Sequence, residues 1–156
     1  MALHEGQNIE TESDRTDVAI AVIVADGRVL ICKRPEGGSF AGYWEFPGGK
    51  REPAETVEGC LVREVAEELA IDVQPRLGLQ TIDHDYPAGR IRLHPYLCAW
   101  IGGQLRPLAC QEARWVDPRE LPRYRFPPAN DSLISEVVAA LRRTSRPAVD
   151  FQPPTA

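Results

Sequence analysis

The sequence has no apolar run that approaches the roughly 18 residues needed to cross a bilayer as a helix. Its start has no basic segment followed by an apolar stretch and a small-residue cleavage site, which is the pattern of a secretory signal. These absences predict a cytoplasmic protein with no membrane partner.

Runs of basic residues are also missing. The formal net charge is −5, and no cluster of Lys and Arg departs locally from that balance. We therefore expect no affinity for duplex nucleic acid, because such binding rests on neutralising the backbone phosphates. A polyphosphate ligand would need a metal ion between its own charges and the acids of the protein.

Cysteine is scarce and irregularly spaced. The four cysteines are Cys32, Cys60, Cys98 and Cys110, and none of them forms a CxxC pair or another zinc-binding spacing. We expect free thiols in a reducing compartment and no zinc site. The sequence also lacks internal repeats and low-complexity linkers.

The residues that are present suffice for one core. The chain has 156 residues, of which 43% are hydrophobic and 26% charged, values typical of a globular domain. We expect the domain at 18–144, a polar, acidic arm at 1–17 and a Pro-rich tail at 145–156.

Alternating and β-branched apolar runs predict strands at 18–24, 29–33, 79–84, 91–101 and 113–116, with a short extended piece at 44–46. Turns or connections are expected at 25–28, 47–49, 72–77, 86–90 and 102–103. Helical periodicity predicts helices at 56–69 and 132–143, and a helical turn is expected at 118–124. Mixed strands with two packed helices indicate an α/β sandwich.

The helix expected at 56–69 has an unusual acidic face. Glu64, Glu67 and Glu68 stand at i, i+3 and i+4 and therefore share one side of the helix. Like charges at this spacing destabilise a helix slightly. The residues alone leave two alternatives, a solvated face or a pocket for a hard divalent cation with oxygen ligands.

The Gly-rich turn before this helix completes a known pattern. Gly49, Glu55, Arg63, Glu64, Val65, Glu67, Glu68, Ala70 and Ile71 match the Nudix box in order and spacing. The chain thus resembles the Nudix hydrolases, with one departure: Ala70 replaces the Gly that ends the helix. Because Ala tolerates a left-handed C-cap less well, the geometry of the following turn is in question.

The resemblance implies the Nudix-type α/β/α sandwich and a Mg²⁺-dependent pyrophosphohydrolase, with Mn²⁺ as a possible substitute. Glu64, Glu67 and Glu68 would bind the metal together with the carbonyl group of Gly48. Glu55 and Arg63 would pair as support, and one helix glutamate would orient or deprotonate the attacking water.

Two further segments are similar to the MutT branch, whose members hydrolyse oxidised purine nucleotides such as 8-oxo-dGTP. These segments are GYWEFPGGK at 42–50 and FPPAN at 126–130. The resemblance makes Asn130 the candidate for reading the base, Phe46 and Tyr86 candidates for contacting it, and Arg34 and Lys50 candidates for the rest of the substrate. The alternatives are structural roles without substrate contact: a helix N-cap for Asn130, core packing for the two aromatic rings, and solvation for Arg34.

A second departure lies downstream. Members of this branch often have an acid, a further metal ligand or base, six residues before the tryptophan that corresponds to Trp115, and here that residue is Ala109. Glu112 stands nearby in sequence, and its ability to substitute is open.

Three hypotheses follow. The first is a Mg²⁺-dependent nucleoside triphosphate pyrophosphohydrolase that acts on oxidised dGTP, as a monomer or homodimer. The second is a Nudix enzyme for CTP or a modified pyrimidine nucleotide. The third is a non-catalytic recognition module of the MutT type, which the complete REVAEE string disfavours.

Overall fold

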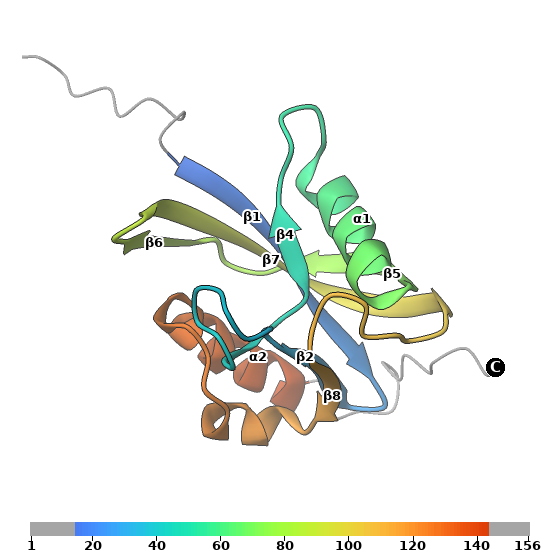
Figure 1. Ribbon diagram of the computed structural model, residues 1–156. Helices are drawn as coiled ribbons and strands as arrows, with labels where there is room; N and C mark the ends of the chain where they lie inside the picture. Colours follow the sequence, from blue (N-terminus) through green and yellow to red (C-terminus); the bar gives the residue numbers. More distant parts are fainter. Residues whose placement is uncertain (1–14, 144–156) are drawn as a thin grey trace, which may run out of the picture.

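The computed structural model describes residues 15–143, which form one mixed sheet with helices on both faces (Figure 1). The predicted tail lies outside the described residues, as does the predicted arm except for its last three residues, which belong to the first strand. The strands are β1 (Arg15–Ala25), β2 (Arg28–Lys33), β3 (Trp44–Glu45), β4 (Gly48–Lys50), β5 (Ile71–Gly78), β6 (Ile82–Tyr86), β7 (Gly89–Gly103) and β8 (Glu112–Val116). The helices are α1 (Val57–Leu69) and α2 (Asp131–Arg143), with 3₁₀ turns η2 (Pro118–Arg123) and η3 (Pro128–Asn130).

Strand β1 is the centre of the sheet. It runs parallel to β7 along one edge and antiparallel to β2 and β4 along the other. The main strand order is β3-β2-β1-β7-β5, with β8 added to β2 and β6 to β7. This topology places the short strand β4 beside the N-terminal half of β1, directly under α1 (Figure 1).

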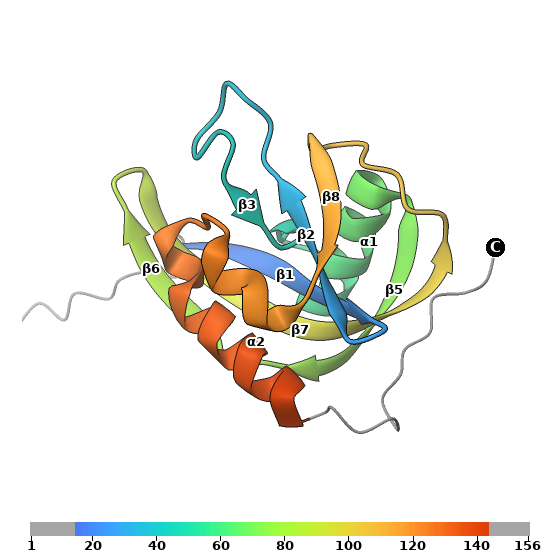
Figure 2. The same cartoon turned by 90° about the horizontal axis from the view of Figure 1, so that it is seen from below.

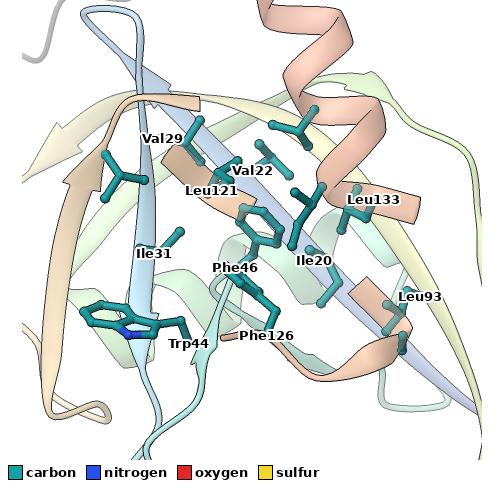
Figure 3. Close-up of a cluster of buried hydrophobic side chains, with 14 of the residues drawn as sticks. Ile20, Val22, Val29, Ile31, Trp44, Phe46, Leu93, Leu121, Phe126 and Leu133 are labelled. Atoms are coloured by element: carbon teal, nitrogen blue, oxygen red, sulfur yellow. The ribbon is translucent and has the colours of Figure 1, made fainter. Parts of the chain in front are cut away.

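Successive residues of β1 point to opposite faces, as the period of a strand requires. Ile20 belongs to a core cluster that includes Leu133 of α2 (Figure 3), whereas Ala21 belongs to a second cluster that includes Leu61 and Val65 of α1. The two helices therefore cover opposite faces of the sheet (Figure 2), and the predicted α/β/α sandwich is confirmed. Among residues 15–143, no helix is long and apolar enough to cross a membrane.

The segment predicted to be a connection at 72–77 is part of a strand, β5. Ile71 and Val73 are buried while Asp72 and Gln74 are exposed, so the alternation of a half-buried strand is present. Pro75 lies within this strand, where a proline is unusual. It is tolerated because β5 is an edge strand with irregular register near that residue.

The predicted turns at 47–49 and 102–103 also differ from the structure. Gly48 and Gly49 begin β4, and Gly102 and Gly103 end β7. Gly48 has φ 152°, and a Cβ atom there would overlap the carbonyl oxygen of Ala19. The glycine therefore allows a close approach of two backbones, which lets a turn-like sequence pair as a strand.

The two ends of helix α1 are capped differently, and the C-terminal cap is the one that the Ala70 substitution put in question. Its N-terminus has an ordinary cap, in which the hydroxyl of Thr56 accepts a hydrogen bond from the backbone N–H of Gly59 at 3.0 Å. Its C-terminus has Ala70 at φ 58°, in the left-handed region that Gly occupies without strain. The required cap conformation is thus formed in spite of the substitution.

Ala70→Gly is expected to stabilise the protein by roughly 0.5–1 kcal/mol, because it removes the steric cost of a left-handed alanine and outweighs the added freedom of the unfolded chain. Urea unfolding at equilibrium measures the effect. Ala66→Gly, in the interior of the same helix, is the matched control and should destabilise by about 1 kcal/mol. A loss of stability in Ala70→Gly would contradict the strain assigned to this cap.

Candidate active site

The acidic helix α1 lies against strand β4 through three contacts. The backbone N–H of Gly48 donates to Glu68 Oε2 at 3.4 Å. The Cys60 thiol lies 3.6 and 3.4 Å from the carbonyl oxygens of Gly49 and Lys50. These contacts hold the glycine-rich strand beside the carboxylates of the helix.

Gly49 makes room for one of these carboxylates. A Cβ atom at this position would lie 2.6 Å from Glu64 Oε2 and 2.8 Å from Glu64 Oε1. The Glu64 side chain is 19% exposed, so its carboxylate sits in a partly closed space whose wall is the bare backbone of β4.

Arg63 forms a bidentate ion pair with Glu55, as expected. Arg63 Nη2 lies 2.6 Å from Glu55 Oε1, and Arg63 Nε lies 3.0 Å from Glu55 Oε2. The guanidinium beside Glu55, with the backbone N–H of Glu52, lowers the pKa of Glu55 to about 2. The pair links the loop before α1 to the middle of the helix, since Glu55 stands two residues before its first turn.

The same guanidinium separates the acids that we expected to converge. Arg63 Nη1 donates to Glu64 Oε1 at 3.0 Å and to Glu67 Oε2 at 3.3 Å, while Glu68 turns towards Gly48. Within residues 15–143, no group of three or more Asp, Glu, His or Cys side chains lies close enough together to bind a metal ion as it stands. The three glutamates share a helix face, as predicted, but their carboxylates do not meet at one point.

The electrostatics of the acidic face nevertheless fit a cation. Burial, together with the charges of Glu45 and Glu64, raises the pKa of Glu68 to about 8, against the opposing effect of the Gly48 hydrogen bond. A buried carboxylate with two acidic neighbours gains from a bound positive charge. The glutamates and the Gly48 carbonyl group offer oxygen atoms, which Mg²⁺ and Mn²⁺ prefer.

Glu45 is an acidic neighbour that the sequence analysis missed. It lies on β3 between the buried residues Trp44 and Phe46 and is half-buried itself. Strand alternation already places Glu45 on the face opposite the two aromatic rings, which is the face that α1 covers. The alternation of residues 44–46 was therefore the sequence signal that could have identified Glu45.

Arg34 pairs with this same acid. Arg34 Nη1 lies 2.6 Å from Glu45 Oε2, and Arg34 Nε donates to the Ser39 carbonyl oxygen at 3.0 Å. Arg34 is therefore neither simply solvated nor remote from the acidic face. Lys50, by contrast, is exposed at the end of β4.

The two polar residues expected at the base lie together. The Tyr86 hydroxyl, at the end of β6, accepts a hydrogen bond from the backbone N–H of Ala129 at 3.1 Å. The next residue, Asn130, is only 8% exposed, and its amide nitrogen donates to the Pro127 carbonyl oxygen at 3.2 Å. Asn130 directly precedes α2, as an N-cap would, but the described hydrogen bond of its side chain does not go to that helix.

Phe46 has a different environment from Tyr86. Its ring is 2% exposed and lies 5.1 Å from the ring of Phe126 between centroids, inside the core cluster of Figure 3. The structure thus supports the packing alternative for this ring. The ring of Tyr86 is more accessible and contacts Phe40 at 5.4 Å, on the loop between β2 and β3.

No acidic side chain occupies residue 109, the position six residues before Trp115. Ala109 is exposed in the loop before β8, and Glu112 forms an ion pair with Arg114, with 2.6 Å between Glu112 Oε1 and Arg114 Nη2. This pairing occupies Glu112 away from the glutamates of α1, so the structure gives no support to its substitution for the missing acid.

The model of the NUDIX domain family matches residues 18–136. The chain belongs to the NUDIX family. The family match and the relatives confirm that it is a Nudix hydrolase, which disfavours the non-catalytic module.

Two of the relatives are named for different substrates. The chain is 34% identical to the CTP pyrophosphohydrolase of Escherichia coli over 132 residues, which cover 85% of this chain and 96% of that protein. It is 36% identical to an 8-oxo-dGTP diphosphatase of Haemophilus influenzae over 113 residues, which cover 72% and 82% of the two chains.

A solved structure has the same fold. The solution structure of the E. coli ORF135 protein matches with a TM-score of 0.74 at 34% identity, covering 86% of this chain and 95% of that one.

Proposed function

We propose that this protein is a Mg²⁺-dependent nucleoside triphosphate pyrophosphohydrolase that releases a nucleoside monophosphate and pyrophosphate. The observation that carries this proposal is the partly closed acidic face of α1 against β4, with Glu64 and Glu68 beside the bare backbone of Gly48 and Gly49. Water attack on a phosphoanhydride needs little covalent chemistry from the protein but much charge neutralisation.

Glu64, Glu67 and Glu68, with the carbonyl oxygen of Gly48, would hold the metal ion. When bound, the ion neutralises phosphate charge and makes a bound water more acidic. One of the helix glutamates orients the attacking water and takes its proton, because Ala109 supplies no acid for that purpose. The Glu55–Arg63 pair keeps Glu64 and Glu67 in place, and Arg34 contacts a phosphate or the sugar of the substrate.

An oxidised purine nucleotide such as 8-oxo-dGTP is the proposed substrate. A side-chain amide offers both a donor and an acceptor, which suits the mixed edge of a guanine-type base. The burial of Asn130 beside the Tyr86 hydrogen bond supports its use in recognition, since a buried amide positioned by its neighbours discriminates strongly. The 8-oxo-dGTP diphosphatase relative supports the same choice.

CTP is the second candidate substrate. The alignment covers 96% of the E. coli CTP pyrophosphohydrolase but only 82% of the 8-oxo-dGTP diphosphatase of H. influenzae. An amide can also pair with the donor and acceptor edge of cytosine.

A hydrolysis screen with product identification tests both candidates. The full chain is incubated with Mg²⁺ and, in turn, 8-oxo-dGTP, dGTP, CTP and dCTP. We expect the highest kcat/KM for 8-oxo-dGTP, pyrophosphate as a product, and no turnover after chelation of the metal. A preference for CTP would favour the second candidate. Release of inorganic phosphate in place of pyrophosphate would contradict the proposed cleavage into a nucleoside monophosphate and pyrophosphate.

Asn130→Ala is expected to lower kcat/KM for the preferred nucleotide by about 10- to 100-fold, mostly through KM, because one bidentate base contact is worth about 1–3 kcal/mol. The preference over the other nucleotides should shrink by the same factor. Steady-state kinetics on the same four nucleotides measure it. Ser132→Ala, which changes an exposed residue at the start of α2, is the control. An equal loss for every nucleotide would mean that Asn130 only supports the fold.

A further inference from the structure

A chain of polar contacts leads from the centre of the sheet to the loop before α1. It begins at Asp17 on β1, whose side chain is only 16% exposed. Asp17 Oδ1 lies 2.9 Å from His94 Nε2 on β7, and Asp17 Oδ2 accepts a hydrogen bond from Arg51 Nη2 at 3.2 Å. The backbone N–H of Arg51 also donates to the Asp17 carbonyl oxygen at 2.9 Å.

Arg51 carries the chain of contacts onwards. It is the first residue after β4, and its Nη1 donates to the backbone carbonyl oxygen of Glu55 at 3.2 Å. The carboxylate of Glu55 is bound in turn by Arg63, which contacts Glu64 and Glu67. Each side-chain contact in this chain has a charged group as donor or acceptor, and such hydrogen bonds are stronger than neutral ones.

The burial of Asp17 distinguishes this network from ordinary surface pairs. Exposed ion pairs contribute little because water screens them. Burial alone would raise the pKa of Asp17, but the hydrogen bonds from His94 and Arg51 and the charge of Arg15 outweigh it and hold that pKa below its ordinary value. An ionised, half-enclosed carboxylate with fixed partners can hold a loop in one position.

We propose that Asp17 is a positioning residue that, through Arg51, fixes the loop at 51–56 and thereby the Glu55–Arg63 pair that orients Glu64 and Glu67. The proposal rests on the proposed metal site at these glutamates. The side chain of Asp17 contacts Arg15, Arg51 and His94 rather than the glutamates of α1. Its effect reaches the site through the placement of the loop.

Asp17→Asn in the full chain tests the proposal. Binding of Mn²⁺ is measured without nucleotide, from the electron paramagnetic resonance signal of the free ion. We expect Mn²⁺ binding to weaken about 3- to 10-fold, which is less than the roughly 10- to 100-fold typical of residues that hold metal ligands directly, because Asp17 acts through Arg51 and the loop. We expect kcat to fall by a similar factor while KM for the nucleotide stays within about twofold, and amide hydrogen exchange at 51–56 to accelerate.

Three further variants make the test specific. Asp85→Asn removes an exposed carboxylate that pairs with Arg90 on the same sheet, at 3.0 Å, and should leave Mn²⁺ binding and kcat unchanged. Asp17→Glu keeps the carboxylate and should recover most of the loss. The third variant, Arg51→Met, is measured alone and combined with Asp17→Asn, and the two effects should not add, because both changes break the same route.

Several results would overturn the proposal. One is wild-type Mn²⁺ binding and kcat in Asp17→Asn together with a lowered melting temperature, which would limit Asp17 to fold stability. Another is strict additivity of the Asp17 and Arg51 effects. Failure of the wild-type chain to bind Mn²⁺ would remove both the metal site and this proposal. A chain that binds Mn²⁺ in the expected rank order but hydrolyses no nucleotide would contradict the proposed function alone.

Discussion

Glu64→Gln is expected to lower kcat about 1,000-fold while leaving the fold intact. The Glu64 carboxylate is partly enclosed against Gly49 and is held by Arg63 Nη1 at 3.0 Å, so it is the best-positioned acid of the helix face. The amide keeps the shape and loses the charge. A 1,000-fold loss corresponds to about 4 kcal/mol of transition-state stabilisation, a magnitude that fits the removal of a metal ligand.

The measurement is steady-state hydrolysis with pyrophosphate detection, together with circular dichroism as a check of folding. Glu58→Gln is the control, because Glu58 lies on the same helix but points to the Tyr96 hydroxyl, at 2.7 Å. Glu67→Gln should have a smaller effect than Glu64→Gln, since the Glu67 side chain is 60% exposed. If Glu64→Gln and Glu67→Gln both retained full activity, the catalytic assignment of the acidic face would be wrong.

Gly49→Ala is expected to lower kcat about 100-fold with little change in stability. The added methyl group would meet the Glu64 carboxylate, with 2.6 Å between its Cβ and Oε2, and the flexible end of that side chain would move away. A displacement of about 1 Å at a reacting centre can reduce a rate about 100-fold. The folding free energy changes little because the displaced group is a side-chain end rather than backbone.

Gly38→Ala is the matched control, since a Cβ atom at Gly38 meets nothing within 4 Å. Kinetics and urea unfolding are measured on both variants. Full activity of Gly49→Ala would show that the Glu64 carboxylate tolerates displacement and that the narrow space beside β4 is not needed. A large loss of stability would instead indicate that the methyl group disturbs the pairing of β4 with β1.

Local patterns in the sequence determined most of the elements. The helix expected at 56–69 and the final helix were predictable, because three- and four-residue apolar spacing is a property of the chain itself. The segment of β5 was missed, because its edge position decides whether Pro75 is tolerated, and that position depends on the assembled sheet.

The candidate site divides in a similar way. Sequence spacing placed Glu64, Glu67 and Glu68 on one helix face, and the resemblance to the Nudix hydrolases implied the pair of Glu55 with Arg63, as the structure has them. The spacing could not reveal that Arg63 reaches between the acids. A side chain with five donors selects its acceptors from whatever lies within its reach, and only the packed helix and loop define that reach.

The acidic helix was thus determined by the sequence alone, as were the family and the covering of the sheet by helices on both faces, whereas the glycine-rich segment before the helix proved to be a strand. Tertiary structure decided which backbone the acids face, that Glu45 joins them, and that Asp17 is bound to the loop carrying Glu55. These groups are far apart in the chain, and pairing of β4 with β1 brings them together. Contacts of this kind follow from the register of the sheet, which no short stretch of sequence specifies.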